Sequence, residues 1–267
     1  MKDASDYAPS LVGAAHALLA EQAPGARLIL LVRTGSHLWG CADSTSDDDV
    51  CGIYVKQLED YLTVDNQPEM VKKTIASFEP TGRELDLSLW DVRKLVRLLG
   101  KSNPSALEWL LSAASLYEDL GAGMLRELAW EMMQPRTLAL HYLGLCKRHG
   151  QRTAASDAYL AKRYLHFYRG LLSCNYVINH EDMPPADVRE LARACGVEEL
   201  KRMEGLVEAK LSLREMPRDE QLEHEFSLMV ERLHMQASGI AQRKPDTSKL
   251  DRVFRQLVLG VVEESND

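Results

Sequence analysis

Apolar positions near the start of the chain predict one helix followed by a buried strand. They recur at helical spacing, at Leu11, Ala14, Ala15, Leu18 and Leu19. Pro24-Gly25 ends that helix, because proline and glycine interrupt regular structure. The segment 26–32 is then apolar apart from Arg27, which is typical of a strand that is buried on both faces. Three further strands are predicted, over 49–55, 71–78 and 84–89.

The pattern changes after residue 89, where helical spacing takes over. Residues 90–99 form one predicted helix, and Asn103-Pro104 begins another, with asparagine as the N-cap and proline at the first helical position. From Gly123 onwards only helical spacing recurs. We therefore predict an α+β protein, in which a small N-terminal α/β domain with a mixed sheet (1–118) precedes a larger all-helical domain (119–267). No flexible linker separates them, so we expect them to pack together and share a cleft.

Composition indicates a globular protein with no membrane span. The chain is 45% hydrophobic and 27% charged, with a net charge of −8. No apolar run approaches the roughly 18 residues of a membrane helix, and the first residues lack the basic and apolar parts of a signal peptide, so we expect a cytoplasmic protein. Five dispersed cysteines without a C-x-x-C pair argue against a disulfide framework and a structural zinc site.

The distribution of charge says more than its sum. Between 135 and 170 the only acid is Asp157, against seven basic residues: Arg136, Lys147, Arg148, Arg152, Lys162, Arg163 and Arg169. Such a stretch is either a solvated helix face or a surface that meets phosphates, and RNA is the phosphate-bearing partner that we consider for it.

Two features between the first predicted strands suggest nucleotide chemistry. Gly35 and Ser36 follow the buried strand, and a glycine beside a small hydroxyl residue lets the backbone approach and bind phosphates. Asp47 and Asp49 begin the next strand, where residues two apart point to the same face. Carboxylate oxygens are the ligands that Mg²⁺ prefers, and a pair of ions can hold both reacting oxygens of a phosphoryl transfer. Asp48 is expected to point the other way, towards solvent or the domain interface.

A third carboxylate is predicted on a neighbouring strand, where Asp86 lies within 84–89. Taken alone, Ser-Asp-Asp-Asp also fits a polar turn before a strand, and only its position after the Gly-Ser pair favours a metal site. A calcium-binding EF-hand loop is excluded, because Asp48 occupies the position that requires glycine when the loop starts at Asp43.

These motifs resemble those of the DNA polymerase β-like nucleotidyltransferase superfamily. Within it, GSHLWG at 35–40 and SDDDVCGIYV at 46–55 look like the RlaP family of predicted nucleotidyltransferases, whose pattern is close to GSHAYG and SDYDxRGVY. The segments 84–112 and 161–177 are similar to its third-carboxylate strand, its Asn-Pro-x-x-x-Glu segment and its helix with Lys and Arg seven apart. Cys51 and Asp48 depart from the pattern, since they replace its arginine and its aromatic residue.

The resemblance implies a role for each matching residue. Asp47, Asp49 and Asp86 would bind two Mg²⁺ ions, or Mn²⁺ in their place, with Asp86 as a metal ligand or base. Nucleotide phosphates of an NTP such as ATP would meet the following residues: Gly35, Ser36, His37, Lys162, His166 and Arg169. His37 could instead cap its loop. We interpret Trp39 as a packing residue and Glu108 as part of the domain junction.

The activity implied is transfer of a nucleoside monophosphate from an NTP to an acceptor hydroxyl, with release of pyrophosphate. An RNA end of the tRNA type is the leading acceptor, because the family is associated with RNA ligases. A protein side chain or a small molecule is an alternative acceptor. A different class also stays open, because Arg136 and His141 have the R-x₄-H spacing of HEPN-type helical ribonucleases and toxin–antitoxin modules.

Overall fold

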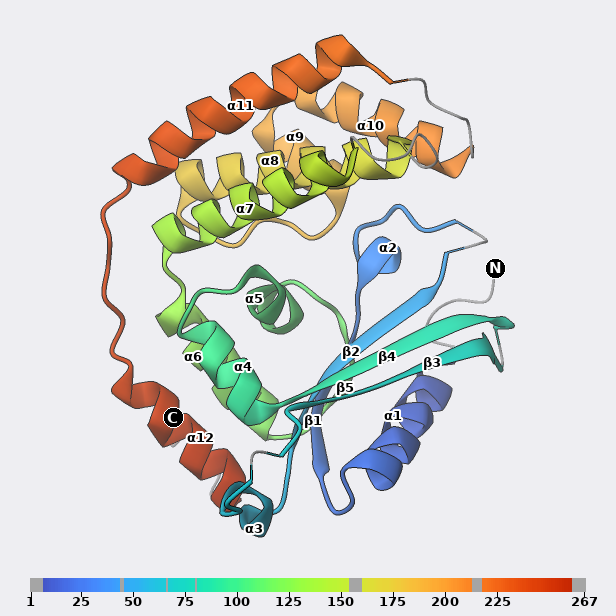
Figure 1. The fold of residues 1–267 in the computed structure, drawn as a ribbon, viewed down its shortest axis with the longest axis vertical. Helices are drawn as coiled ribbons and strands as arrows, with labels where there is room; N and C mark the ends of the chain where they lie inside the picture. The colour runs from blue at the N-terminus through green and yellow to red at the C-terminus, as the bar shows by residue number, and fades with distance from the viewer. Residues whose placement is uncertain are drawn as a thin grey trace.

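The structure is a computed structural model that describes residues 7–43, 46–65, 67–79, 81–153, 160–212 and 218–260. Its described part contains a five-stranded sheet in the order β3-β4-β2-β1-β5 (Figure 1). The strands are β1 (Arg27–Arg33), β2 (Asp48–Val55), β3 (Met70–Phe78), β4 (Arg83–Asp91) and β5 (Ser115–Glu118). β2 and β4 are parallel, and the other neighbours are antiparallel. The predicted mixed sheet and the α+β fold class are confirmed.

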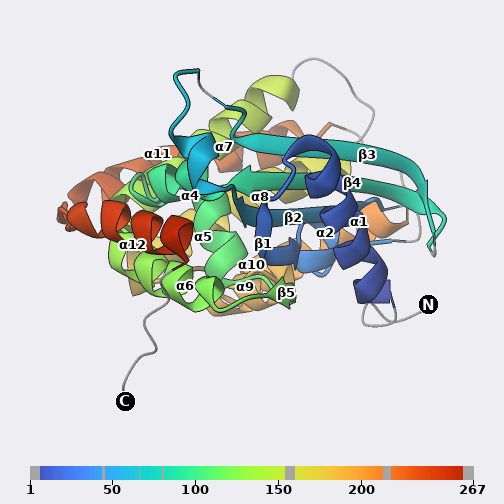
Figure 2. The ribbon, with the colours of Figure 1, turned by 90° about the horizontal axis from the view of Figure 1, so that it is seen from below.

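Helix α1 (Ala8–Gln22) covers one face of the sheet, where leucines of β4 and apolar residues of β3 join it in one core cluster. The opposite face packs against α4 (Val92–Leu99), α5 (Pro104–Leu111) and α6 (Gly121–Met132). Two single-turn helices, α2 (Gly35–Leu38) and α3 (Leu58–Tyr61), lie in the loops that follow β1 and β2. The sheet is therefore the middle layer of its unit, and Figure 2 shows α1 in front of the strands.

The remaining helices form a second layer above the sheet unit in Figure 1. They are α7 (Pro135–Thr153), α8 (Leu160–His180), α9 (Val188–Cys195), α10 (Val197–Leu211) and α11 (Glu220–Gly239). The chain then returns, and α12 (Ser248–Leu259) packs on α4 and α6 at the far end of the sheet unit. The predicted boundary at 118–119 follows β5 directly, but α6 and α12 lie with the sheet unit rather than with the second layer.

Strand β5 was not predicted from the sequence. It has only four residues, and none of them is fully buried, so it carries no apolar pattern of its own. The other predicted strands are confirmed, and Asn103 caps α5 by accepting a hydrogen bond from the backbone N–H of Ala106 at 3.2 Å. Within the described part of the chain, no helix has both the length and the apolar character that a membrane crossing requires.

Candidate functional site

Two of the predicted carboxylates lie side by side on parallel strands. Asp49 of β2 is the register partner of Asp86 of β4, so their side chains leave the same face of the sheet. Asp47 is exposed and directly precedes β2. Burial raises the pKa of Asp49, and the negative charges of Asp86 and Asp47 raise it further. The three carboxylates are therefore close enough to repel one another, and a bound cation would relieve that repulsion.

The carboxylates do not converge as they stand. Asp86 accepts a hydrogen bond from Thr74 Oγ1 of β3 at 2.5 Å, which turns its side chain towards the edge strand. In the part of the chain that the structure describes, no group of three or more His, Cys, Asp or Glu side chains is gathered closely enough to hold a metal ion. Metal binding by Asp47, Asp49 and Asp86 thus stays a prediction.

The glycine loop lies against Asp49. Gly35 has a φ of +64°, and a Cβ atom built on it would lie 1.9 Å from Asp49 Oδ2. The backbone N–H of Thr34 donates to the carbonyl of Asp49 at 2.8 Å. Only glycine permits this approach at this φ. Ser36, the next residue, therefore begins one wall of the site, which is where a phosphate-binding loop is expected.

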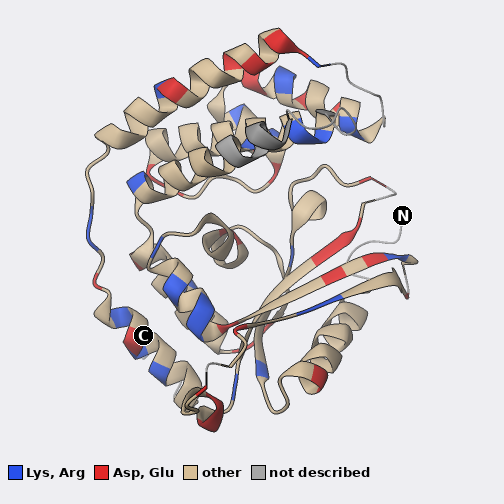
Figure 3. Cartoon of the chain, viewed as in Figure 1, with Lys and Arg blue, Asp and Glu red and all other residues tan. Residues whose placement is uncertain are grey.

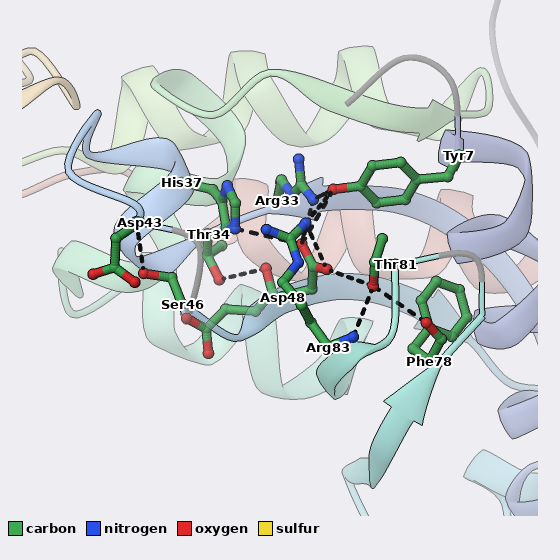
Figure 4. A network of polar contacts seen from close by, with 11 residues as sticks. Tyr7, Arg33, Thr34, His37, Asp43, Ser46, Asp48, Phe78, Thr81 and Arg83 are labelled. Atoms are coloured by element: carbon green, nitrogen blue, oxygen red, sulfur yellow. Dashed lines mark hydrogen bonds and ion pairs between the residues drawn. The ribbon is translucent and has the colours of Figure 1, made fainter. Parts of the chain in front are cut away.

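Asp48 corrects the sequence prediction, because it points neither to solvent nor to the domain interface. It is fully buried on the other face of β2. Arg33 and Arg83 both form ion pairs with it, and the Tyr7 hydroxyl donates to its Oδ1 at 3.4 Å. Thr81 Oγ1 donates to its Oδ2 at 3.4 Å. Figure 4 shows this polar network, which connects the beginnings of β2 and β4 with the end of β1.

His37 lies beside the same network. Its Nε2 is 3.5 Å from Asp48 Oδ1, and its side chain is 12% exposed. Burial lowers the pKa of His37 to about 4, and the positive charge of Arg33 adds to that effect. A neutral imidazole that faces Asp48 fits a loop-anchoring role, and a role in nucleotide binding stays a prediction.

Three residues predicted to face the nucleotide lie on α8. The charge of Lys162 opposes the rise that burial causes in the pKa of Asp49, so Lys162 lies on the side of the carboxylates. The ring of His166 meets the ring of Trp39 edge-on, with centroids 5.0 Å apart. The Arg169 guanidinium lies over the Trp39 ring, 4.1 Å from its centroid, and forms an ion pair with Glu108.

The cluster around Trp39 confirms two interpretations of the sequence. Trp39 packs against the core, and its Nε1 donates to Glu108 Oε1 at 3.2 Å. Glu108 therefore lies at the junction of the two layers, as expected. Cys51, which replaces the arginine of the family pattern, lies 3.5 Å from Thr34 Oγ1, and burial raises the pKa of its thiol to about 12. An uncharged thiol cannot make the contacts of a guanidinium.

Sequence reasoning missed the residues that hold the loop after α2. The backbone N–H of Val188 donates to the carbonyl of Trp39 at 3.1 Å, and Arg189 Nη1 donates to the carbonyl of Gly40 at 2.7 Å. Lys210 Nζ donates to the carbonyl of Cys41 at 2.7 Å. These donors come from α9 and α10, about 150 or more residues away along the chain. No local sequence pattern therefore predicts them.

In the residues that the structure describes, the basic stretch 135–170 occupies α7 and α8 (Figure 3). The side chains of Lys147, Arg148 and Arg152, and the whole of Asp157, lie outside the described residues. His141 is described, and its Nε2 lies 3.1 Å from the carbonyl of Lys101. Phosphate binding by this surface stays a prediction.

The fold, the glycine loop and the paired carboxylates define a polymerase-β-like nucleotidyltransferase. The model of one family, described as the RNA repair pathway DNA polymerase beta family (RlaP), matches residues 15–256, and the chain belongs to this family. The protein is therefore a nucleotidyltransferase enzyme. The resemblance found in the sequence motifs is confirmed.

The chain is similar to two known proteins. The uncharacterized protein YcgL of Bacillus subtilis (strain 168) is 33% identical over 251 residues, which cover 91% of this chain and 93% of YcgL. A crystal structure of a nucleotidyltransferase-like protein from Exiguobacterium sibiricum 255-15 aligns with 85% of this chain and 74% of its own, at 15% identity and a TM-score of 0.35.

Proposed function

We propose that the protein transfers a nucleoside monophosphate from an NTP to the terminal hydroxyl of an RNA, with two Mg²⁺ ions bound by Asp47, Asp49 and Asp86. The single observation that carries the proposal is the pairing of Asp49 with Asp86 on parallel strands beside the Gly35 loop. The description of the family, which names an RNA repair pathway, supports RNA as the acceptor.

The donor set fits magnesium. All three side chains are carboxylates, which are the hard oxygen ligands that Mg²⁺ selects. Burial of Asp49 together with the charges of Asp86 and Asp47 raises the pKa of Asp49, so the site disfavours its own ionised form until a cation is bound. Once bound, the ions supply charge neutralisation at the attacking and leaving oxygens.

The residues of the chain then have separate roles in phosphate binding and proton transfer. Gly35 and Ser36 lie where backbone N–H groups can meet phosphate oxygens, and Lys162 approaches the same carboxylates from α8. The acceptor hydroxyl attacks the α-phosphorus, its proton passes to Asp86, and the bond to pyrophosphate breaks. Asp86 suits this role because its strand lies between β2 and the edge strand β3, whose residues Thr74 and Lys72 are exposed.

Label transfer tests the proposal. The purified protein is incubated with an NTP labelled at the α-phosphate, Mg²⁺ and single-stranded RNA or tRNA, and label on the RNA is measured. Asp49→Asn and Asp86→Asn should each reduce transfer by about 100-fold or more, because each removes a charge that acts in the transition state. Glu84→Gln is the matched control, since Glu84 lies two residues before Asp86 on β4 and is exposed.

The position of the label separates the alternatives. Label on a protein band or a small molecule would replace RNA as the acceptor while keeping the chemistry. Absence of transfer to every acceptor, with nucleotide binding intact, would contradict the proposal. Full activity in an Asp47→Ala/Asp49→Ala double variant would favour the ribonuclease reading of Arg136 and His141.

A further inference from the structure

The face of β3 and β4 that carries Asp86 continues beyond the candidate site. On β4, Leu85, Leu87 and Leu89 are buried in the cluster that contains α1. The alternating residues Asp86 and Ser88 therefore lie on the opposite face.

Their register partners on β3 lie on that face as well. Thr74 pairs with Asp86, Lys72 with Ser88 and Met70 with Trp90. Directly opposed residues of antiparallel strands point to the same side of the sheet. Thr74 and Lys72 are exposed, so this side of β3 is open to solvent.

Lys94 of α4 reaches over the same face. Its Nζ lies 4.4 Å from the centroid of the Trp90 ring and 3.5 Å from Met70 Sδ. The ion pairs of the described residues include none made by Lys94; the negative charge of Glu69 acts on Lys94, but the Glu69 carboxylate is ion-paired with Arg97. Burial lowers the pKa of Lys94, and the charge of Glu69 offsets this effect only in part, so the ammonium group favours a further anion.

Lys72 supplies a second cation nearer to Asp86. Its pair with Ser88 is two residues from the pair of Thr74 with Asp86, which corresponds to about 7 Å along the strands. Trp90, under Lys94, is about 13 Å from Asp86 by the same rise per residue. Figure 3 shows basic positions on β3 and α4 beyond the acidic positions of β2 and β4. The cations thus lie in a row that leads away from the carboxylates.

We propose that this strip, defined by Lys72, Ser88 and Lys94, binds the sugar-phosphate backbone of the acceptor RNA just before its terminal hydroxyl. The inference rests on the proposed function and specifies how the acceptor lies in that site. The terminal hydroxyl is at Asp86, and the preceding phosphates meet Lys72 and then Lys94. Cations spaced along one face, with no ion pair of their own among the described residues, match the regular charges of a single-stranded polynucleotide. The triphosphate enters from the other side, where Gly35 and Lys162 lie.

Binding of a labelled single-stranded RNA oligonucleotide, measured by fluorescence anisotropy over a range of salt concentrations, tests the strip. Lys72→Gln and Lys94→Gln should each weaken binding about five- to tenfold at low salt. Each should also reduce the slope of log K against log salt by about 0.7, because one phosphate contact is lost. Affinity for ATP should stay unchanged in both variants.

Lys73→Gln is the matched control. Lys73 is the next residue of β3, points to the other face and pairs with Glu21 of α1 at 2.7 Å. Its substitution removes the same charge but should leave RNA affinity and the salt slope within about twofold of the wild type. Equal losses of RNA affinity in the Lys72→Gln and Lys73→Gln variants would overturn the proposal. Wild-type RNA affinity in both the Lys72→Gln and Lys94→Gln variants would overturn it as well. Failure of the wild-type protein to bind RNA would also overturn it.

The two assays together distinguish failure of the RNA-binding strip from failure of the proposed function. If the Lys72 and Lys94 variants transfer label to limiting RNA as well as the wild type does, the strip is rejected and the proposed function stands. Strip-dependent RNA binding without label transfer would reject the function and keep the strip. Parallel losses for DNA and RNA of the same sequence would support the strip, because contacts to phosphate do not distinguish the sugars.

Discussion

Arg169 of α8 forms an ion pair with Glu108 of α5, and this pair connects the helical layer to the sheet unit. Both side chains are largely buried, with exposed fractions of 12% and 15%. The same Glu108 oxygen accepts a hydrogen bond from Trp39, and Arg169 lies over the Trp39 ring. The three side chains therefore fix the loop after Gly35 relative to both layers.

Glu108→Gln should destabilise the protein by about 3 kcal/mol, because it leaves the Arg169 charge buried without its partner. Chemical denaturation followed by circular dichroism measures the change. Glu198→Gln is the control, since Glu198 pairs with Lys201 on the surface at exposed fractions of 82% and 67%. That loss should stay within about 0.5 kcal/mol. Equal stabilities of the two variants would contradict a structural role for the Glu108 pair.

Asp48→Asn should destabilise the protein by about 3–5 kcal/mol. The carboxylate is fully buried between Arg33 and Arg83, so its neutralisation leaves two largely buried guanidinium groups without a counter-charge. Asp47→Asn is the matched control, because Asp47 is the preceding residue and is exposed. Its unfolding free energy should change by less than about 0.5 kcal/mol. Wild-type stability of the Asp48 variant would show that the network contributes nothing.

The same neighbourhood shows how far sequence can predict this site. The alternation along 47–49 correctly places Asp49 on one face of β2 and Asp48 on the other. Burial of Asp48 was missed because its partners come from separate parts of the chain, at Tyr7, Arg33, Thr81 and Arg83. Each of these residues looks like an ordinary polar position where it occurs. Only the folded chain brings them together.

Strand prediction succeeded and failed for a similar reason. Segment 26–32 is buried from Leu28 to Val32, so its apolar run directly reflects its position in the middle of the sheet. β5 is a short edge strand that pairs only with β1, and its partly exposed residues carry no pattern. The donors from Val188, Arg189 and Lys210 to the loop after α2 were missed because they depend on how the two layers pack.

Stability should fall in mildly acidic solution because of His37. Burial and the charge of Arg33 lower its pKa to about 4, whereas an unfolded histidine has a pKa near 6.5. Between these values the unfolded chain binds a proton that the folded protein excludes, so the free energy of unfolding decreases as the pH is lowered through this window. Above pH 6.5 the contribution is constant.

His37→Asn should remove that part of the pH dependence. Between pH 7 and pH 5 the wild type should lose about 2 kcal/mol more than the variant, as measured by urea denaturation at both pH values. His224→Asn is the control, since His224 is exposed on α11 and should leave the wild-type dependence intact. An identical loss in wild type and His37 variant would show that folding does not lower the pKa of His37.

Gly35→Ala should reduce nucleotidyl transfer by about tenfold or more through displacement of Asp49. The new Cβ would lie 1.9 Å from Asp49 Oδ2, so the carboxylate has to move.

Gly82→Ala is the matched control: its φ of +69° is close to the +64° of Gly35, but nothing lies within 4 Å of its Cβ position. Both variants should lose about 1 kcal/mol of stability, because alanine is disfavoured at positive φ. Only Gly35→Ala should also lose transfer activity and Mg²⁺ affinity. We expect a loss of roughly tenfold or more in each, because one metal ligand is displaced. Comparable activities in the two variants would separate Gly35 from the metal site, since backbone strain alone would then account for both.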